Sequence, residues 1–169
     1  MIIDLSKVLK YEDAKVEFDS CLDIKEVSFA GDTYRFLEPI RVTGSIHKSG
    51  GPLQLTGRVS GVMSVNCYRC MKEVQKDFNF QLDEILVSND SHDTEDDEAI
   101  RFNGDKIDIT EVVINNILIN MSMKHLCSVD CKGLCPQCGA DLNVTECKCS
   151  TEVIDPRLEV LKKLLNNKE

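Results

Sequence analysis

Cysteine content constrains this chain of 169 residues more than any other feature, because six of its nine cysteines fall within residues 127–149. In the reducing cytosol, clustered cysteines bind metal more often than they form disulfides. An odd number of cysteines also fits poorly with a closed disulfide framework. The sequence therefore predicts a C-terminal segment that folds around metal.

The strongest metal-binding motif is Cys135-Pro-Gln-Cys138-Gly139. Two intervening residues let both sulfurs reach one ion, and the glycine tolerates the positive φ that turns backbone amides toward the thiolates. Cys147 and Cys149 supply two further sulfurs. Four cysteines leave no open coordination position, so we expect a structural zinc site.

A second pair, Cys67 and Cys70, lies between two long alternating segments, where a hairpin turn is expected. Cys127 and Cys131 are its candidate partners from elsewhere in the chain. This pairing predicts a second four-cysteine site, and hence one or two zinc ions in total. Cys21 is left over and is expected to be a small buried hydrophobic residue.

Other interpretations of the cysteines remain open. Cys131, Cys135 and Cys138 have the spacing of a radical-type iron–sulfur site, although the chain lacks the βα alternation of those enzymes. Cys67 and Cys70 could form a redox dithiol, and the cysteines together could form a redox switch. His125 is either a zinc ligand or a surface histidine.

Alternation of apolar and polar residues predicts the sheet. It runs through residues 40–47, 53–66 and 74–87, which indicates a three-stranded antiparallel meander. Gly57 and Gly61 on the apolar side suggest bends or bulges. Asn103-Gly104 is a hairpin turn signal within residues 100–109.

Two helices are expected near the C-terminal end. One begins at Asp108 or Thr110, and a second begins at Asp155 with Pro156 in its first turn. Residues 1–10 fit a short strand or helix, whereas residues 14–38 have no clear period. The first helix should bury one apolar stripe, formed by Val113, Ile114, Ile117, Leu118 and Met121.

These patterns predict an α+β fold: an antiparallel curved sheet or partial barrel, a few helices and a small C-terminal zinc-ribbon-like module. The expected boundary separates a core of residues 1–125 from a cysteine-rich module with a terminal helix at residues 126–169. An acidic loop at residues 89–99 should project from the core.

Charge and motifs exclude several functional classes. The formal net charge is −9, so no general basic surface for nucleic acid is encoded. Three histidines and the absence of phosphate-loop, dinucleotide-binding, serine-nucleophile and zinc-protease motifs indicate a protein without enzymatic activity or a small-molecule substrate. The start has no secretory signal and no apolar run is long, so a cytoplasmic location without a membrane span is expected.

Several motifs together resemble the YceD family of large ribosomal RNA subunit accumulation proteins, over roughly residues 40–165. They are Cys67-x-Arg69-Cys70, Asp108-Ile109, the run LCSVDCKGLCPQCGADLN with its following C-x-C, and Asp155-Pro-Arg-Leu158. The resemblance implies a cytoplasmic, non-enzymatic ribosome-biogenesis factor that supports accumulation of large-subunit ribosomal RNA. Its partner would be that RNA or a ribosomal protein.

If RNA is contacted directly, cations around the cysteines are the candidates, with Tyr68 and Phe78 for stacking. These cations are Arg58, Arg69, Lys72, Lys76, Lys132 and Lys148. A solvated sheet face is the competing interpretation of each. Two other functions stay open: an acidic adaptor that holds a basic ribosomal protein, and a thiol-based metal or redox sensor.

Overall fold

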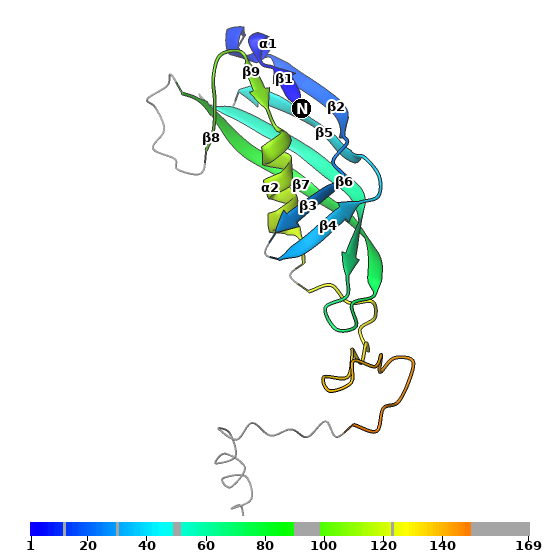
Figure 1. Ribbon diagram of the computed structural model, residues 1–169. Helices are drawn as coiled ribbons and strands as arrows, with labels where there is room; N and C mark the ends of the chain where they lie inside the picture. The colour runs from blue at the N-terminus through cyan, green and yellow to red at the C-terminus, as the bar shows by residue number, and fades with distance from the viewer. Residues whose placement is uncertain (12, 30, 49–51, 90–98, 123, 150–169) are drawn as a thin grey trace, which may run out of the picture.

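A computed structural model describes residues 1–11, 13–29, 31–48, 52–89, 99–122 and 124–149. Nine strands and two helices lie in these ranges (Figure 1). In chain order they are β1 (Ile2–Asp4), α1 (Ser6–Lys10), β2 (Lys15–Leu22), β3 (Glu26–Phe29), β4 (Asp32–Phe36), β5 (Ile40–Lys48), β6 (Leu53–Asn66), β7 (Glu73–Ser88), β8 (Ile100–Phe102), β9 (Lys106–Asp108) and α2 (Thr110–Asn120).

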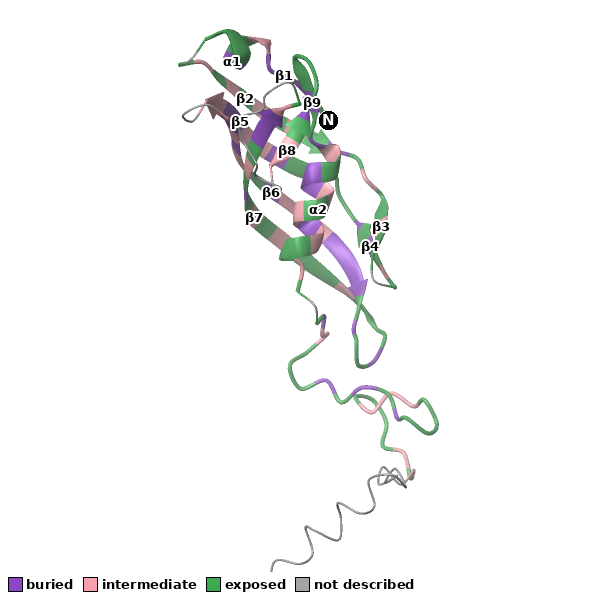
Figure 2. Ribbon diagram, turned by 90° about the vertical axis from the view of Figure 1, so that its left-hand side faces the viewer, coloured by how far each residue is buried: buried purple, intermediate pink, exposed green. Residues whose placement is uncertain are grey.

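A seven-stranded open sheet dominates the molecule, and β6 lies at its centre. One edge of β6 pairs with β7 over its whole length, and the other pairs first with β5 and then with β4. The expected α+β fold and its β5–β6–β7 meander are confirmed. Figure 2 shows α2 over one face of the sheet, where the apolar core lies.

Strands β2, β3 and β4 occupy the region whose sequence has no clear period. Exposed and half-buried residues alternate along β2, and only Leu22 is buried. This strand is the outer neighbour of β5 and its exposed positions carry Lys15, Glu17 and Asp19. An edge strand needs few apolar residues, so its sequence signal is weak.

The glycines of β6 do not mark bulges. The β6–β7 register continues without interruption from Leu53 to Asn66, so the expected bulges are absent. Gly57 instead faces Gly44 of β5, and a Cβ on Gly57 would lie 2.5 Å from the Thr43 carbonyl oxygen. Glycine is required here because two backbones approach closely.

The turn at Asn103-Gly104 does not close a hairpin. Gly104 has a φ of 68°, as a tight turn requires, but the flanking strands have different partners. β8 pairs with β7 in parallel, whereas β9 pairs with β1 in a separate two-stranded sheet. The turn signal was correct and the inferred pairing was wrong, because pairing depends on distant strands.

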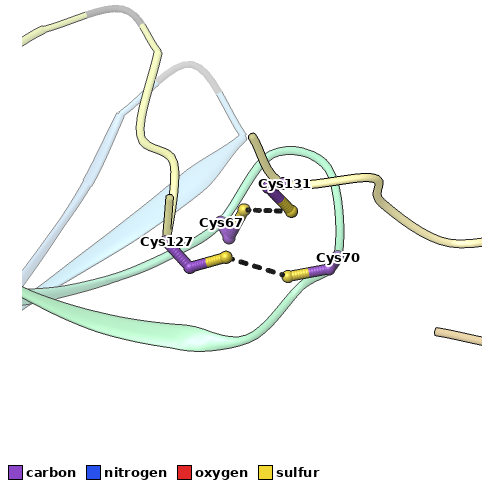
Figure 3. Close-up of side chains that lie close together, drawn as sticks. All are labelled: Cys67, Cys70, Cys127 and Cys131. Atoms are coloured by element: carbon purple, nitrogen blue, oxygen red, sulfur yellow. Dashed lines mark hydrogen bonds between the residues drawn. The ribbon is translucent and has the colours of Figure 1, made fainter. Parts of the chain in front are cut away.

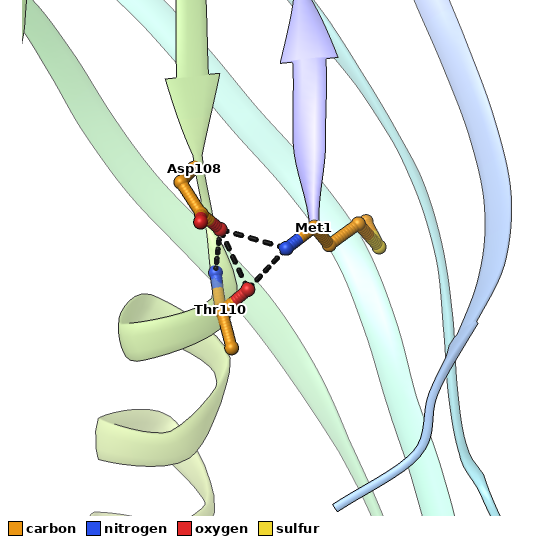
Figure 4. A network of polar contacts seen from close by, with 3 residues as sticks. All are labelled: Met1, Asp108 and Thr110. Carbon is orange, nitrogen blue, oxygen red and sulfur yellow. Dashed lines mark hydrogen bonds and ion pairs between the residues drawn. The ribbon is translucent and has the colours of Figure 1, made fainter.

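A polar network holds the start of α2 (Figure 4). The Asp108 carboxylate accepts hydrogen bonds from the Thr110 backbone N–H at 2.9 Å and from the Met1 ammonium at 2.7 Å. The ammonium also donates to the Thr110 hydroxyl. The Met1 ammonium, followed by Thr110, keeps the pKa of Asp108 well below its usual range. The expectation that Asp108 or Thr110 caps this helix was wrong, because Ile109 is the N-cap residue and no side chain caps it; Asp108 lies one residue earlier and binds the N–H of the first helical residue.

The apolar face of α2 packs on the core much as expected. Val113 and Ile117 are buried, Leu118 and Met121 pack against the core, and Ile114 is only half-buried. Two other expectations, the acidic loop and the helix beginning at Asp155, fall on residues 90–98 and 150–169, outside the described residues.

We expect Gly57→Ala to lower the free energy of unfolding by about 1–3 kcal/mol, because the added Cβ must push apart two backbones. Urea unfolding followed by circular dichroism measures this. Ser60→Ala on the opposite face of the same strand is the matched control and should change stability by less than about 0.5 kcal/mol. Equal losses in the two variants would contradict the close-approach explanation.

Candidate metal centres

The first group of cysteines forms where the β6–β7 hairpin turns. Cys67 and Cys70 face each other across this turn, and the Met71 N–H donates to the Cys67 carbonyl at 2.9 Å. Met71 adopts a φ of 61°, which is uncommon for a residue other than glycine. The tight turn holds it in this conformation. The segment after α2 then brings Cys127 and Cys131 to the same place.

These four sulfurs have the spacing of a tetrahedral site (Figure 3). The Sγ atoms of Cys67 and Cys131 lie 3.8 Å apart, and those of Cys70 and Cys127 lie 3.6 Å apart. For a metal–sulfur bond of about 2.3 Å, a regular tetrahedron separates its sulfurs by about 3.8 Å. The group could therefore hold one metal ion with little rearrangement.

A second group contains Cys135, Cys138, Cys147 and Cys149, whose sulfurs also lie within 4.8 Å of one another. Its knuckle repeats the geometry of the first. The Gly139 N–H donates to the Cys135 carbonyl at 2.9 Å, and Gly139 has a φ of 72°. The two knuckles thus share one backbone conformation, although only the second has glycine at the position with positive φ.

The two groups differ in exposure. In the first, Cys67, Cys70 and Cys131 are buried and Cys127 is half-buried. In the second, only Cys135 is buried and Cys138 is exposed. The first group therefore lies inside the junction of two chain segments, whereas solvent reaches the second.

Backbone amides favour a thiolate at the first cysteine of each knuckle. Burial opposes ionisation of Cys67, but N–H groups of Cys70 and Arg69 donate to its sulfur and lower its pKa to about 6. The corresponding two amides of the second knuckle lower the pKa of Cys135 to about 6. Each knuckle is thus prepared to present a charged ligand.

The thiols of Cys127 and Cys149 resist ionisation because of the sulfurs around them. The sulfurs of Cys131 and Cys70 raise the pKa of Cys127 to about 12. The sulfur of Cys138 is the main cause that raises the pKa of Cys149 to about 12. Four ionised sulfurs in so small a space require a cation, which is what a bound metal supplies.

Side chains around the first group support it from outside. The Asn143 amide donates to Cys131 Sγ at 3.5 Å, and its oxygen accepts the Lys132 N–H at 2.7 Å. Arg69 Nη1 donates to the Cys131 carbonyl at 2.6 Å. Gly133 has a φ of 79°, and a Cβ there would lie 2.9 Å from the Arg69 carbonyl oxygen. Sequence reasoning missed Asn143 and Gly133, because no spacing rule marks them.

The structure corrects two single-residue expectations and one alternative. His125 is 3% exposed and belongs to neither cysteine group, since its ring packs edge-on against Tyr34 and Tyr68. Cys21, expected to be buried, is exposed on β2. The three cysteines with iron–sulfur spacing do not meet, because Cys131 belongs to the first group and the other two to the second.

The cations considered for RNA contact are distributed over two regions. Arg58 lies exposed on the face of β6 that points away from the core, and the other five lie in or near the cysteine groups. Arg69 already uses its guanidinium to bind the 127–131 segment. The side chains of the remaining four are exposed: Lys72, Lys76, Lys132 and Lys148.

Comparisons with known proteins agree with the family resemblance. A family model described as large ribosomal RNA subunit accumulation protein YceD matches residues 55–165. YlbN of Bacillus subtilis is 31% identical over 150 residues, which cover 88% of this chain and 87% of YlbN.

Two further relatives are longer than this chain. Rv2926c of Mycobacterium tuberculosis is 33% identical over 66% of this chain, and the match spans 55% of that protein. The chloroplastic YCED homolog 1 of Zea mays, named as a large ribosomal RNA subunit accumulation protein, is 28% identical over 66% of this chain and 48% of its own length. The chain thus spans about half the length of these two relatives. No solved structure matches the chain.

Neither helix in the described part of the chain has both the length and the apolar character that crossing a lipid bilayer requires.

We expect two metal ions per chain and independent loss of each. Cys70→Ser and Cys138→Ser should each retain one ion, because the four sulfurs of either group include none from the other. The double variant should retain none. Elemental analysis of freshly purified protein measures these ratios.

Cys21→Ser is the matched control, since this exposed cysteine lies outside both groups and its loss should leave two ions. Limited proteolysis adds a second readout: Cys138→Ser should become sensitive within residues 132–149, while β5–β7 stay resistant. A variant that keeps both ions, or loses both through one substitution, would contradict two separate sites.

Proposed function

Because this chain belongs to the YceD family, we propose that it is a non-enzymatic cytoplasmic factor that supports accumulation of large-subunit ribosomal RNA. The match to the family over residues 55–165 carries this proposal. That range includes all eight cysteines of the two groups, α2 and all but the first two residues of the β6–β7 hairpin.

Zinc is the metal we propose for both groups. Zinc prefers four-coordinate tetrahedral sites, and four thiolates complete its coordination without an open position for water or substrate. A closed site of this kind supports structure and not catalysis. Binding would stabilise residues 127–149, which form one isolated β-bridge between Leu134 and Asp141 and contribute few buried apolar side chains.

The first zinc would then join two units of the chain, a sheet domain of residues 1–125 and a module of residues 126–169. Two of its ligands, Cys67 and Cys70, come from the hairpin, and two come from the start of the module. A backbone hydrogen bond from Leu134 N–H to the Arg69 carbonyl, 3.0 Å long, supports the same junction.

Direct RNA contact would involve the exposed lysines beside this junction. Lys72 and Lys76 follow the first knuckle, and Lys132 lies in the segment tied to it. Arg58 and Lys148 would extend the contact. Arg69 would contribute less, because its guanidinium already donates to the Cys131 carbonyl. Phosphate contacts of this kind make affinity dependent on salt.

The proposal is tested in cells that lack this protein. The ratio of large-subunit to small-subunit ribosomal RNA should fall, and the parent chain should restore it. A variant with Cys67→Ser and Cys70→Ser should restore it poorly, because the junction loses two ligands, whereas Cys21→Ser should act like the parent chain. An unchanged RNA ratio in cells without the protein would overturn the proposed function.

Direct contact has its own test, in which binding to large-subunit ribosomal RNA fragments is titrated at several salt concentrations. The double variant Lys72→Ala, Lys76→Ala should reduce the salt slope by about 1 for each lysine that contacts phosphate. Lys7→Ala, Lys10→Ala in α1 is the matched control and should keep the parent slope. Equal slopes in all three proteins would exclude these two lysines from the RNA contact.

A further inference from the structure

The long strand β7 has one free edge. Along its other edge it pairs with β6 from Glu73 to Leu86, whereas on this edge β8 pairs only with Leu86–Ser88. In the described part of the chain, no other strand pairs with this edge between residues 73 and 85. Figure 2 shows β7 along the margin of the sheet, with α2 over the adjoining face.

The backbone groups that face this edge can be identified. The Leu37 N–H donates to the Val62 carbonyl at 2.9 Å, so Val62 directs its backbone groups away from β7. Val62 lies opposite Asp77, which therefore directs its own N–H and C=O away from β6, toward the free edge. Because this direction alternates along a strand, Gln75, Asn79 and Gln81 do the same.

The charged side chains that β7 contributes to one face of the sheet are acidic. Glu73, Asp77 and Asp83 lie on the face of the sheet that points away from α2, and β7 contributes no basic residue to that face; Arg58 of β6 lies on the same face, opposite Gln81. Glu73 accepts a hydrogen bond from the Ser64 hydroxyl, and Asp83 accepts one from the Gln54 amide. Asp77 has no ion pair within the described residues and is exposed.

The opposite face beside the same edge carries an aromatic pocket. Phe78 and Phe80 stack with ring centroids 6.2 Å apart, and both are half-buried. They line a pocket of about 480 Å³ that is open to solvent and is closed on one side by the end of α2. Met63, Ile117 and Met121 complete its apolar lining, and Lys76 and Lys124 lie at its border, so the groups that enter it should be apolar and uncharged.

We propose that this edge binds a basic, extended segment of a partner polypeptide as an additional strand. Its backbone would pair with the outward N–H and C=O groups of residues 75–81. Its side chains would alternate, with lysine or arginine beside Asp77 and Asp83 and apolar groups entering the aromatic pocket. Added strands use main-chain hydrogen bonds for affinity and pockets for alternate side chains for specificity.

Charge favours this occupant over two others. If β7 of a second copy paired with the edge, the acidic residues of both copies would lie on one face, where like charges destabilise pairing. RNA would bring its phosphates toward the same carboxylates. A basic peptide instead gains charge complementarity along this face.

The test measures binding of a fluorescent peptide of alternating lysine and valine, about ten residues long, to the full chain. Asn79→Pro removes one outward N–H without removing a hydrogen bond to β6, and should weaken binding at least about tenfold. Asn79→Ala keeps that N–H and is the matched control. Asp77→Lys should also weaken binding, because it places a positive charge beside the peptide lysines. Metal content and urea unfolding show whether each variant is folded.

Parent-like affinity of Asn79→Ala, with weak binding by Asn79→Pro and Asp77→Lys, supports the added strand. Equal affinity of the two Asn79 variants would overturn it, as would equal binding of a peptide with glutamate in place of lysine. A dimer of the parent chain that Asn79→Pro disrupts would identify a second copy as the occupant. Loss of RNA-fragment binding in Asn79→Pro alone would identify RNA. The peptide readout does not depend on ribosomal RNA levels, so it stands or falls separately from the function proposed above.

Discussion

The meeting of four sulfurs at the end of the β6–β7 hairpin is the interaction on which the arrangement of the chain depends. Cys67 and Cys70 reach this point through a continuous fourteen-residue pairing, whereas Cys127 and Cys131 reach it only after the chain has completed the sheet and α2. Four thiolates repel one another unless a cation neutralises them. The stability of this four-sulfur contact therefore depends on how tightly a cation binds there. Around it, Arg69 and Asn143 donate hydrogen bonds that hold the incoming segment in place.

The hairpin that carries this junction also presents two kinds of surface close together. Exposed lysines follow the knuckle, and the segment held by the first group adds Lys132. Along β7 the free edge is acidic on one face and aromatic on the other, and Lys76 belongs to the aromatic face. A single long strand therefore presents exposed lysines near the first cysteine group and an unpaired edge beside α2.

Sequence reasoning succeeded where the signal was local. Alternation located β5, β6 and β7, and the C-x-x-C spacing identified both knuckles. Where the answer depended on a distant neighbour, the pairing of Cys67 and Cys70 with Cys127 and Cys131 was correct, whereas two other expectations were wrong. Gly57 looked like a bulge because the opposing Gly44 could not be foreseen. His125 looked like a ligand or a surface residue, yet two tyrosine rings from β4 and the knuckle enclose it.

The sequence by itself determined the conformation of each knuckle and the strands of the meander, because these depend on residues within a few positions of one another. It also determined the family of the chain, which depends on several short motifs that follow one another in a fixed order. The sequence suggested by elimination that Cys67 and Cys70 pair with Cys127 and Cys131, and the tertiary structure confirms that these four sulfurs meet. Only the tertiary structure decided which strand edge stays open. Cys67 and Cys131 are 64 positions apart, and their sulfurs approach to 3.8 Å only because the sheet and α2 fold the intervening chain back on itself. The number of residues between two cysteines does not say whether their sulfurs meet, because packing of the sheet and α2 sets the path of the chain between them.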